Sequence, residues 1–96
     1  MIGVIVTFQY DSAVDRERIL KIASEAAPRF EGVAGLRSKV FTLDESNARA
    51  TNVYVWESED AARAFFDDAL VERVTALYGV RPTVDFVEIA ALVDNS

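Results

Sequence analysis

Residues 36–57, LRSKVFTLDESNARATNVYVWE, decide the fold of this chain. Two runs rich in β-branched and aromatic residues, about 36–43 and 50–57, alternate as strands do and flank the polar stretch 44–47. Asp, Ser and Asn at this point are typical of a tight turn, so the stretch predicts a β-hairpin. A doubly wound parallel sheet would join these two strands through a helix, and the hairpin therefore disfavours that fold.

The segment before the hairpin predicts one strand and one helix. The strand covers about 2–9, where Ile2, Val4, Val6 and Phe8 share one face and Gly3, Ile5 and Thr7 share the other. Ser12 followed by Asp15 resembles a capping box and predicts the start of a helix that ends near Phe30. Apolar side chains recur along it at helical spacing: Ile19, Ile22, Ala23, Ala26 and Phe30.

The segment after the hairpin predicts a second helix and a last strand. Ser58 is a favourable N-cap for the second helix. If this helix is continuous, it contains a kink and ends at Gly79. The last strand covers about 83–90. The order βαββαβ predicts an α+β ferredoxin-like plait, a four-stranded antiparallel sheet with two helices on one face. The chain is one domain, 1–96, because dividing 96 residues between two domains would leave each half too short to form its own core.

The second face of the predicted sheet is also apolar. The strand 2–9 is apolar on both faces, and the third strand places Val53 and Val55 opposite Tyr54 and Trp56. A monomer with one sheet face in water should alternate between apolar and polar residues. A bare apolar face of this kind is typical of a partner surface, so we expect an obligate homodimer that packs sheet against sheet.

Composition excludes several classes of function. The chain has no Cys and no His, so disulfides, thiolate nucleophiles, Ser-His-Asp triads and imidazole-ligated metals or haem are excluded. The formal net charge of −6 makes nucleic acid and anionic membranes poor partners. The sequence shows no signal peptide and no apolar run long enough to span a bilayer, so we expect a cytoplasmic protein.

Four short motifs resemble the YdhR-type monooxygenases of the dimeric α+β barrel superfamily: GLRSKVF at 35–41, YVWES at 54–58, GVRP at 79–82 and ALVDN at 91–95. The resemblance spans nearly the whole chain. It implies a ferredoxin-like protomer and a dimer whose two sheets form a barrel. The wider superfamily includes cofactor-free oxygenases of polyketide aromatics and haem-degrading enzymes, and many members have a pocket between sheet and helices. Haem-degrading relatives need a helical His, which this chain lacks.

Asn52, Tyr54 and Trp56 share one face of the third strand. An Asn and a Trp at this spacing resemble the pocket pair of the cofactor-free quinone-forming oxygenases. The resemblance implies catalytic roles for both, with Asn52 donating a hydrogen bond to a substrate oxyanion and Trp56 donating or stacking. Tyr54 is a second donor or part of the wall. The alternative is structural, with Trp56 in the core and Asn52 bonded to backbone.

The sequence departs from that pattern in one respect. The related oxygenases carry a tyrosine shortly after the Trp, where this chain has Ala61 and Ala62, so its role cannot be transferred. Arg37 and Lys39 alternate on the second strand and bind an anionic group, or lower the pKa of a phenol, if they face a pocket. On an edge strand they are charges that discourage aggregation. Phe65 is helix core and pocket wall.

The leading hypothesis is a cofactor-independent monooxygenase, without metal, for a small phenolic or polycyclic aromatic molecule. The alternative is a non-catalytic small-ligand-binding or interaction dimer of the same fold. RNA-recognition modules share the βαββαβ order and stack bases on sheet aromatics, but the acidic charge and the missing Lys/Arg-Gly-aromatic segment argue against them. Acylphosphatase-like enzymes need a phosphate-binding loop after the first strand, and residues 9–12 contain no Gly.

Overall fold

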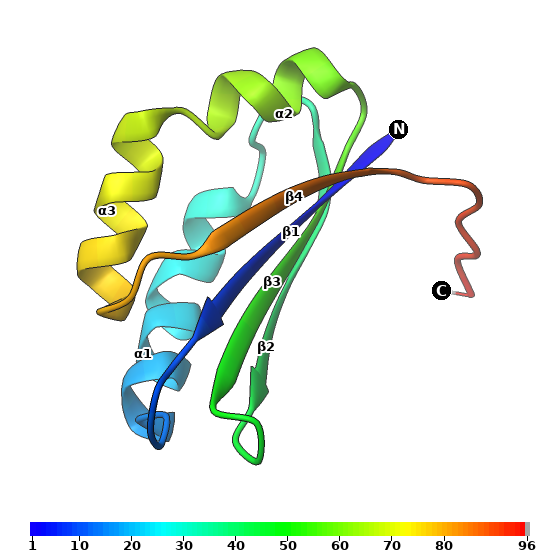
Figure 1. Cartoon of the computed structure of the whole chain (residues 1–96). Coiled ribbons are helices and arrows are strands. Elements are labelled where there is room, and N and C mark those ends of the chain that lie inside the picture. Colours follow the sequence, from blue (N-terminus) through cyan, green and yellow to red (C-terminus); the bar gives the residue numbers. More distant parts are fainter. Residues whose placement is uncertain (96) are drawn as a thin grey trace.

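The computed structural model describes residues 1–95, which form one four-stranded antiparallel sheet and its helices (Figure 1). The elements in chain order are β1 (Ile2–Gln9), α1 (Arg16–Ala26), a 3₁₀ turn η1 (Ala27–Phe30), β2 (Leu36–Asp44), β3 (Arg49–Trp56), α2 (Glu59–Phe65), α3 (Asp68–Tyr78) and β4 (Thr83–Glu88). The strand order is β2-β3-β1-β4, and all three neighbouring pairs are antiparallel. The predicted α+β sheet and its hairpin are confirmed.

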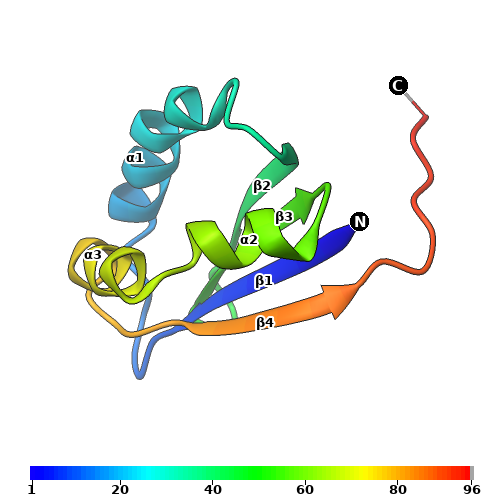
Figure 2. The same ribbon diagram turned by 90° about the horizontal axis from the view of Figure 1, so that it is seen from above.

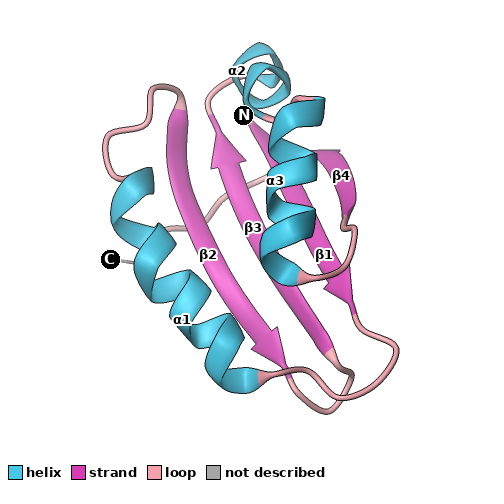
Figure 3. Cartoon of the chain, turned by 90° about the vertical axis from the view of Figure 1, so that its left-hand side faces the viewer, coloured by secondary structure: helices cyan, strands magenta, loops and turns pink. Residues whose placement is uncertain are grey.

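All the helices lie on one face of the sheet. Seen from above, α1, α2 and α3 share one side of the four strands, and the opposite face carries no helix (Figure 2). Figure 3 shows α1 and α3 crossing that face side by side, with α2 at one end of the strands. The chain after β4 leaves on the side away from the helices (Figure 1). No helix within residues 1–95 has both the length and the hydrophobicity needed to cross a membrane.

Side-chain caps fix where the helices begin, and two of them differ from the expectation. The cap of α1 is Asp15, which accepts from the Arg18 backbone N–H at 3.1 Å, so the helix starts later than the Ser12 reading predicts. Ser58 caps α2 as expected. The predicted second helix is two helices, because Phe66 leaves helical geometry and Asp67 caps α3 through the Leu70 backbone N–H at 2.8 Å.

A β-bulge in β2 decides which of its side chains face the helices. Leu36 pairs with Trp56 while Ser38 pairs with Val55, so Arg37 is an extra residue without a partner. Beyond the bulge Lys39 lies opposite Tyr54, whose side chain faces the helices. Strict alternation predicts one face for Arg37 and Lys39. The bulge leaves Arg37 unpaired and exposed, whereas Lys39 is half-buried opposite Tyr54.

The core lies between the two central strands and the helices. β3 alternates strictly between buried and half-buried positions, and β1 follows the same pattern over most of its length. Val4, Phe8 and Trp56 are the largest fully buried side chains. Truncating a buried aromatic residue of this kind to Ala costs about 3–5 kcal/mol. The packed core is therefore anchored on β1 and β3.

Candidate functional site

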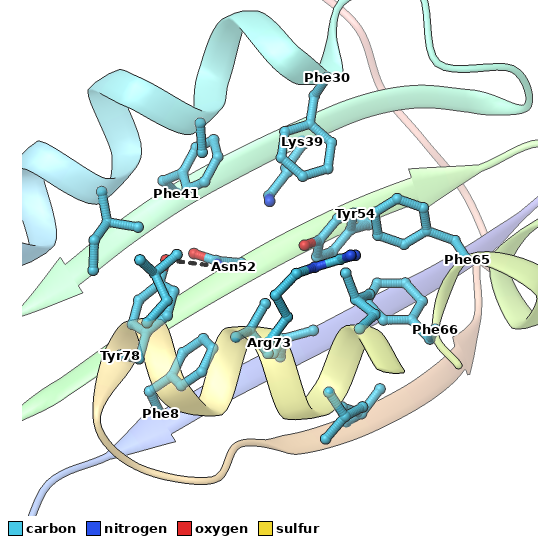
Figure 4. Close-up of a pocket in the computed structure, with 18 of the residues that line it drawn as sticks. Phe8, Phe30, Lys39, Phe41, Asn52, Tyr54, Phe65, Phe66, Arg73 and Tyr78 are labelled. Atoms are coloured by element: carbon cyan, nitrogen blue, oxygen red, sulfur yellow. Dashed lines mark hydrogen bonds between the residues drawn. The ribbon is translucent and has the colours of Figure 1, made fainter. Parts of the chain in front are cut away.

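A cavity of about 690 Å³ lies between the sheet and the helices (Figure 4). Its walls come from all four strands, from α1, α2 and α3 and from η1, and most of them are aliphatic or aromatic. Six polar or charged side chains line it: Arg29, Lys39, Asn52, Tyr54, Arg73 and Tyr78. An apolar cavity of this size with a few converging polar groups is typical of a small-molecule site.

The charges in the cavity are all of one sign. Arg29, Lys39 and Arg73 line it, and no Asp or Glu does. The chain as a whole is acidic, with 16 Asp and Glu against 10 Lys and Arg, so this excess of cations is local. The lining also holds no imidazole or thiolate, and within residues 1–95 no cluster of three or more His, Cys, Asp or Glu could hold a metal. The site favours an anionic or ionisable ligand.

Lys39 extends from β2 into the cavity and ends among three aromatic rings (Figure 4). Its Nζ lies 3.5 Å from the ring centre of Phe30, 4.1 Å from that of Phe41 and 4.4 Å from that of Tyr54. The ion pairs of the described residues lie elsewhere on the surface, so no carboxylate neutralises the amine. Burial lowers the pKa of Lys39 to about 7, while the ring faces favour the ammonium form and oppose that shift.

Asn52 and Tyr78 join β3 to the end of α3. Asn52 is buried, and its Nδ2 donates a hydrogen bond to Tyr78 Oη at 3.2 Å (Figure 4). The Tyr78 ring stacks on Phe8 with 3.7 Å between ring centres, and Tyr10 Oη donates to the Tyr78 carbonyl at 2.8 Å. Burial raises the pKa of Tyr78, and the hydrogen bond from Asn52 opposes this. Tyr78 is thus held neutral and fixed at one end of the cavity.

Tyr54 faces the cavity and separates it from Trp56. Burial, and secondarily the neighbouring Tyr78, raises the pKa of Tyr54, so its hydroxyl stays protonated. Tyr54 stacks on Trp56 with ring centres 6.2 Å apart, and Phe65 lies 5.2 Å from Trp56. Both Tyr54 and Phe65 line the cavity, whereas Trp56 is fully buried behind them. The Trp56 Nε1–H is buried and has no acceptor among residues 1–95.

The structure therefore sorts the residues singled out from sequence into two groups. Asn52, Tyr54, Lys39 and Phe65 come together at the cavity. Two others lie elsewhere: Trp56 lies one layer behind the wall, and Arg37 is exposed in the bulge of β2.

Comparison with known proteins agrees with the fold. The family described as "Putative mono-oxygenase ydhR" matches residues 4–86, which is most of the chain. The chain belongs to the YdhR family. This confirms the resemblance found in the sequence motifs. No curated protein matches this YdhR-family chain in the comparison.

Solved structures share the fold of this YdhR-family chain at low sequence identity. A monooxygenase from the gene ActVA-Orf6 of Streptomyces coelicolor, solved with Nanaomycin D, is 22% identical with a TM-score of 0.70, covering 98% of this chain and 92% of that one. SnoaB, a cofactor-independent oxygenase from Streptomyces nogalater, is 14% identical with a TM-score of 0.68, covering 96% and 95%. The heme-degrader MhuD from Mycobacterium tuberculosis, solved with two hemes bound, is 18% identical with a TM-score of 0.67, covering 98% and 100%.

Three polar groups at the cavity of this chain were not assigned from sequence: Arg29, Arg73 and the Tyr78 hydroxyl. A signal for Tyr78 exists, because it lies four residues after Val74 and so shares a face of the helix. Arg73 borders the same stripe. Arg29 precedes Phe30 in a 3₁₀ turn, and there the periodicity of an α-helix does not predict which side chains face the sheet.

Proposed function

We propose that this chain is a cofactor-independent monooxygenase acting on a small phenolic or polycyclic aromatic substrate. The observation that supports it is the cavity itself, which combines aromatic walls with the buried Asn52 amide in a chain of the YdhR monooxygenase family. SnoaB, which has this fold, is a cofactor-independent oxygenase. A small aromatic molecule fits the volume and the apolar lining.

Asn52 is the proposed oxyanion donor. Its amide has two N–H bonds, and one of them is directed at Tyr78 Oη. Among the described residues this is the one hydrogen bond that its side chain makes. The other N–H is therefore available to the oxygen of a bound phenolate, in a site of low dielectric constant where such a bond is strong. The substrate itself supplies the electrons for dioxygen once it is ionised.

Tyr54, Phe65 and Lys39 complete the proposed substrate site. Tyr54 and Phe65 provide aromatic surface on which a flat substrate stacks. The Lys39 charge stabilises the anionic form of the substrate. For Trp56 we propose a donor role that depends on movement of the neighbouring rings of Tyr54 and Phe65. Its Nε1–H is buried without an acceptor among residues 1–95, and such a donor costs about 1–3 kcal/mol. Arg37 has no part in this proposal.

We also propose that the working form is a homodimer that pairs the open faces of two sheets. Ile5, Val53 and Val40 lie side by side across the three strands β1, β3 and β2 on that face. Val40 is 53% exposed and Val87 is 39% exposed. These aliphatic side chains form an apolar centre that a second copy would cover, bordered by Asp85 opposite Ile5 and by a row of threonines.

Oxygen uptake with a panel of anthrones and hydroquinones tests the proposed activity. The assay contains no added flavin, metal or NAD(P)H. We expect uptake above the spontaneous rate, and a loss of about 10²–10³-fold in Asn52→Ala because an oxyanion donor is removed. Trp56→Phe should lower the rate less, because it keeps the packing and removes the indole N–H.

Asn47→Ala is the matched control, because it makes the same chemical change in the exposed hairpin turn. Its rate should equal that of the wild type. Ligands that quench or enhance Trp56 fluorescence without any oxygen uptake would favour the alternative function, a non-catalytic binder of small aromatic molecules. Uptake that is equal in the wild type and in Asn52→Ala would remove Asn52 from the site.

A further inference from the structure

The proposed reaction needs a group that takes a proton from the substrate, and few side chains at the cavity can do this. The titratable groups that line it are Arg29, Lys39, Tyr54, Arg73 and Tyr78. Arginine stays protonated at any working pH. Burial raises the pKa of both tyrosines, so each keeps its own proton. The chain has no His, and no carboxylate lines the cavity, which leaves one amine.

The position of Lys39 suits this role. The bulge at Arg37 brings Lys39 onto the helix-covered face, opposite Tyr54. Its Nζ ends 3.5 Å from the ring centre of Phe30 and within 4.4 Å of those of Phe41 and Tyr54, where a flat aromatic ligand would stack. Burial lowers its pKa to about 7, which moves the loss of its proton toward neutral pH.

We propose that Lys39 is the general base of the cavity, the residue that takes the proton from a bound phenol or anthrone. This inference rests on the proposed function and adds to it the step that starts the reaction. A base must lie within hydrogen-bond reach of the proton that it removes, and Lys39 carries the one amine that lines the cavity. The same residue, once protonated, is the counter-ion of the substrate anion.

The electrons and protons balance for an anthrone. The Lys39 amine takes one proton from the substrate CH₂ carbon and leaves a carbanion, which passes one electron to dioxygen. The substrate radical and superoxide combine in a carbon–oxygen bond, and the peroxide anion takes the proton back from the Lys39 ammonium. Loss of water, through cleavage of the O–O bond and removal of the second C–H proton, gives the carbonyl. Dioxygen is reduced to water and carbonyl oxygen, and the amine is regenerated.

The two lysines of the chain, Lys21 and Lys39, allow a direct test that needs no activity. Reductive methylation with ¹³C-formaldehyde labels these two amines and the α-amine of Met1, and NMR follows all three signals through a pH titration. The Lys39 signal is assigned by its loss in Lys39→Arg. Lys21 is exposed on α1 and serves as the internal reference, assigned by its loss in Lys21→Arg. We expect the Lys39 signal to titrate near neutral pH. Titration of both lysine signals together at alkaline pH would overturn the proposal.

Oxygen uptake tests the proton transfer itself. We expect the wild-type rate to rise with pH to a plateau, with a midpoint near the pKa of Lys39. Lys39→Arg keeps the positive charge but cannot accept a proton. Lys39→Met keeps the length of the side chain and loses both the charge and the basic nitrogen. Each should lower the rate by about 10²–10⁴-fold and remove the rising limb near neutral pH. Lys21→Met is the control and should keep the wild-type profile.

The outcomes separate this proposal from the proposed function. A wild-type protein that consumes oxygen, with Lys39→Arg retaining both rate and pH profile, would overturn the general base and leave the oxygenase intact. If no substrate of the panel is consumed, calorimetry of phenol binding in buffers of different ionisation enthalpy decides. In the wild type, Lys39 acting as base keeps the proton that the phenol loses on binding, so little proton is released to the buffer. In Lys39→Arg the same ionisation should release about one proton to the buffer. Equal release by both proteins would also overturn it.

Discussion

The two faces of the same sheet present different surfaces. On the helix-covered face, β1 and β3 bury large side chains, and the space beside them is a cavity with converging polar groups. On the open face the same strands carry Ile5, Val53 and Val55, with no buried polar group among them. Alternation along a strand assigns each residue to a face, and the layer that covers the face decides what its residues do.

This difference separates the evidence for a ligand from the evidence for a partner. The covered face offers the Asn52 amide, the Lys39 amine and two tyrosine hydroxyls inside one concave space, and that pattern suits a small molecule. The open face has an aliphatic centre at Ile5, Val53 and Val40, bordered by Asp85 and by a row of threonines, and an aliphatic centre with a polar border suits another protein surface. Substitutions on the open face should therefore leave ligand binding intact, and substitutions at the cavity should leave the association of two copies intact.

The largest effect is expected from a charge at the centre of the open face. Val53 lies between Ile5 and Val40 in the register of the sheet. Val53→Asp would place two carboxylates in the apolar interface of a symmetric dimer, each without a partner, at a cost of several kcal/mol. We expect the dissociation constant to rise by more than about 100-fold, measured by sedimentation at micromolar concentration.

Leu20→Asp is the matched control for this change. Leu20 is an aliphatic residue exposed on α1, which lies on the covered side of the sheet. The same acidic substitution there should leave a dimer intact. A wild-type protein that sediments as a monomer at this concentration would contradict the proposed role of the open face.

On the covered face, the uncompensated amine of Lys39 should make stability depend on pH. Its pKa is about 7 in the folded protein and 10.5 in the unfolded chain, so the unfolded state binds more protons between these values. Stability contributed by this group therefore rises as the pH increases from 7 toward 10. Lys39→Met should flatten this rise and stabilise the protein at pH 7 by about 2 kcal/mol, less than the full shift implies because part of the side chain stays hydrated.

Urea unfolding of both proteins from pH 6 to 9.5 measures this effect. The window ends there because the tyrosines act in the opposite direction above it. The pKa values of Tyr54 and Tyr78 are raised, so the folded protein keeps protons that the unfolded chain loses, and stability falls. Parallel pH profiles for wild type and Lys39→Met would show that Lys39 is fully hydrated.

The sequence predicts the fold because its signals are local. The turn residues 44–47 identify the hairpin, and apolar spacing identifies the strands and α1. The errors arise where two local signals compete. Ser12 and Asp15 both suit an N-cap, and Asp15 takes the role. Asp67 is a third cap inside an apolar helical pattern, and it divides the second helix because a capped start outweighs continued periodicity there.

The site is harder to predict because it depends on the relation between elements. Asn52 and Tyr54 follow from alternation on β3, and the structure places both at the cavity. The face of the sheet on which Lys39 lies depends on the bulge at Arg37, and no pattern in the sequence predicts an extra residue in this strand. The contact between Asn52 and Tyr78 joins residues 26 positions apart, and it requires the crossing of α3 over β3, which only tertiary packing fixes.

The smallest effect is expected from this contact. Tyr78→Phe keeps the ring that stacks on Phe8 and removes the hydroxyl that accepts from Asn52. The free energy of unfolding should fall by about 1 kcal/mol, since the Asn52 amide loses its acceptor but still faces the cavity. A double-mutant cycle with Asn52→Ala measures the contact itself, and we expect a coupling of about 0.5–1.5 kcal/mol. Strictly additive effects would show that the two side chains are held by packing alone, and the amide would then be free to turn toward a ligand without breaking any bond.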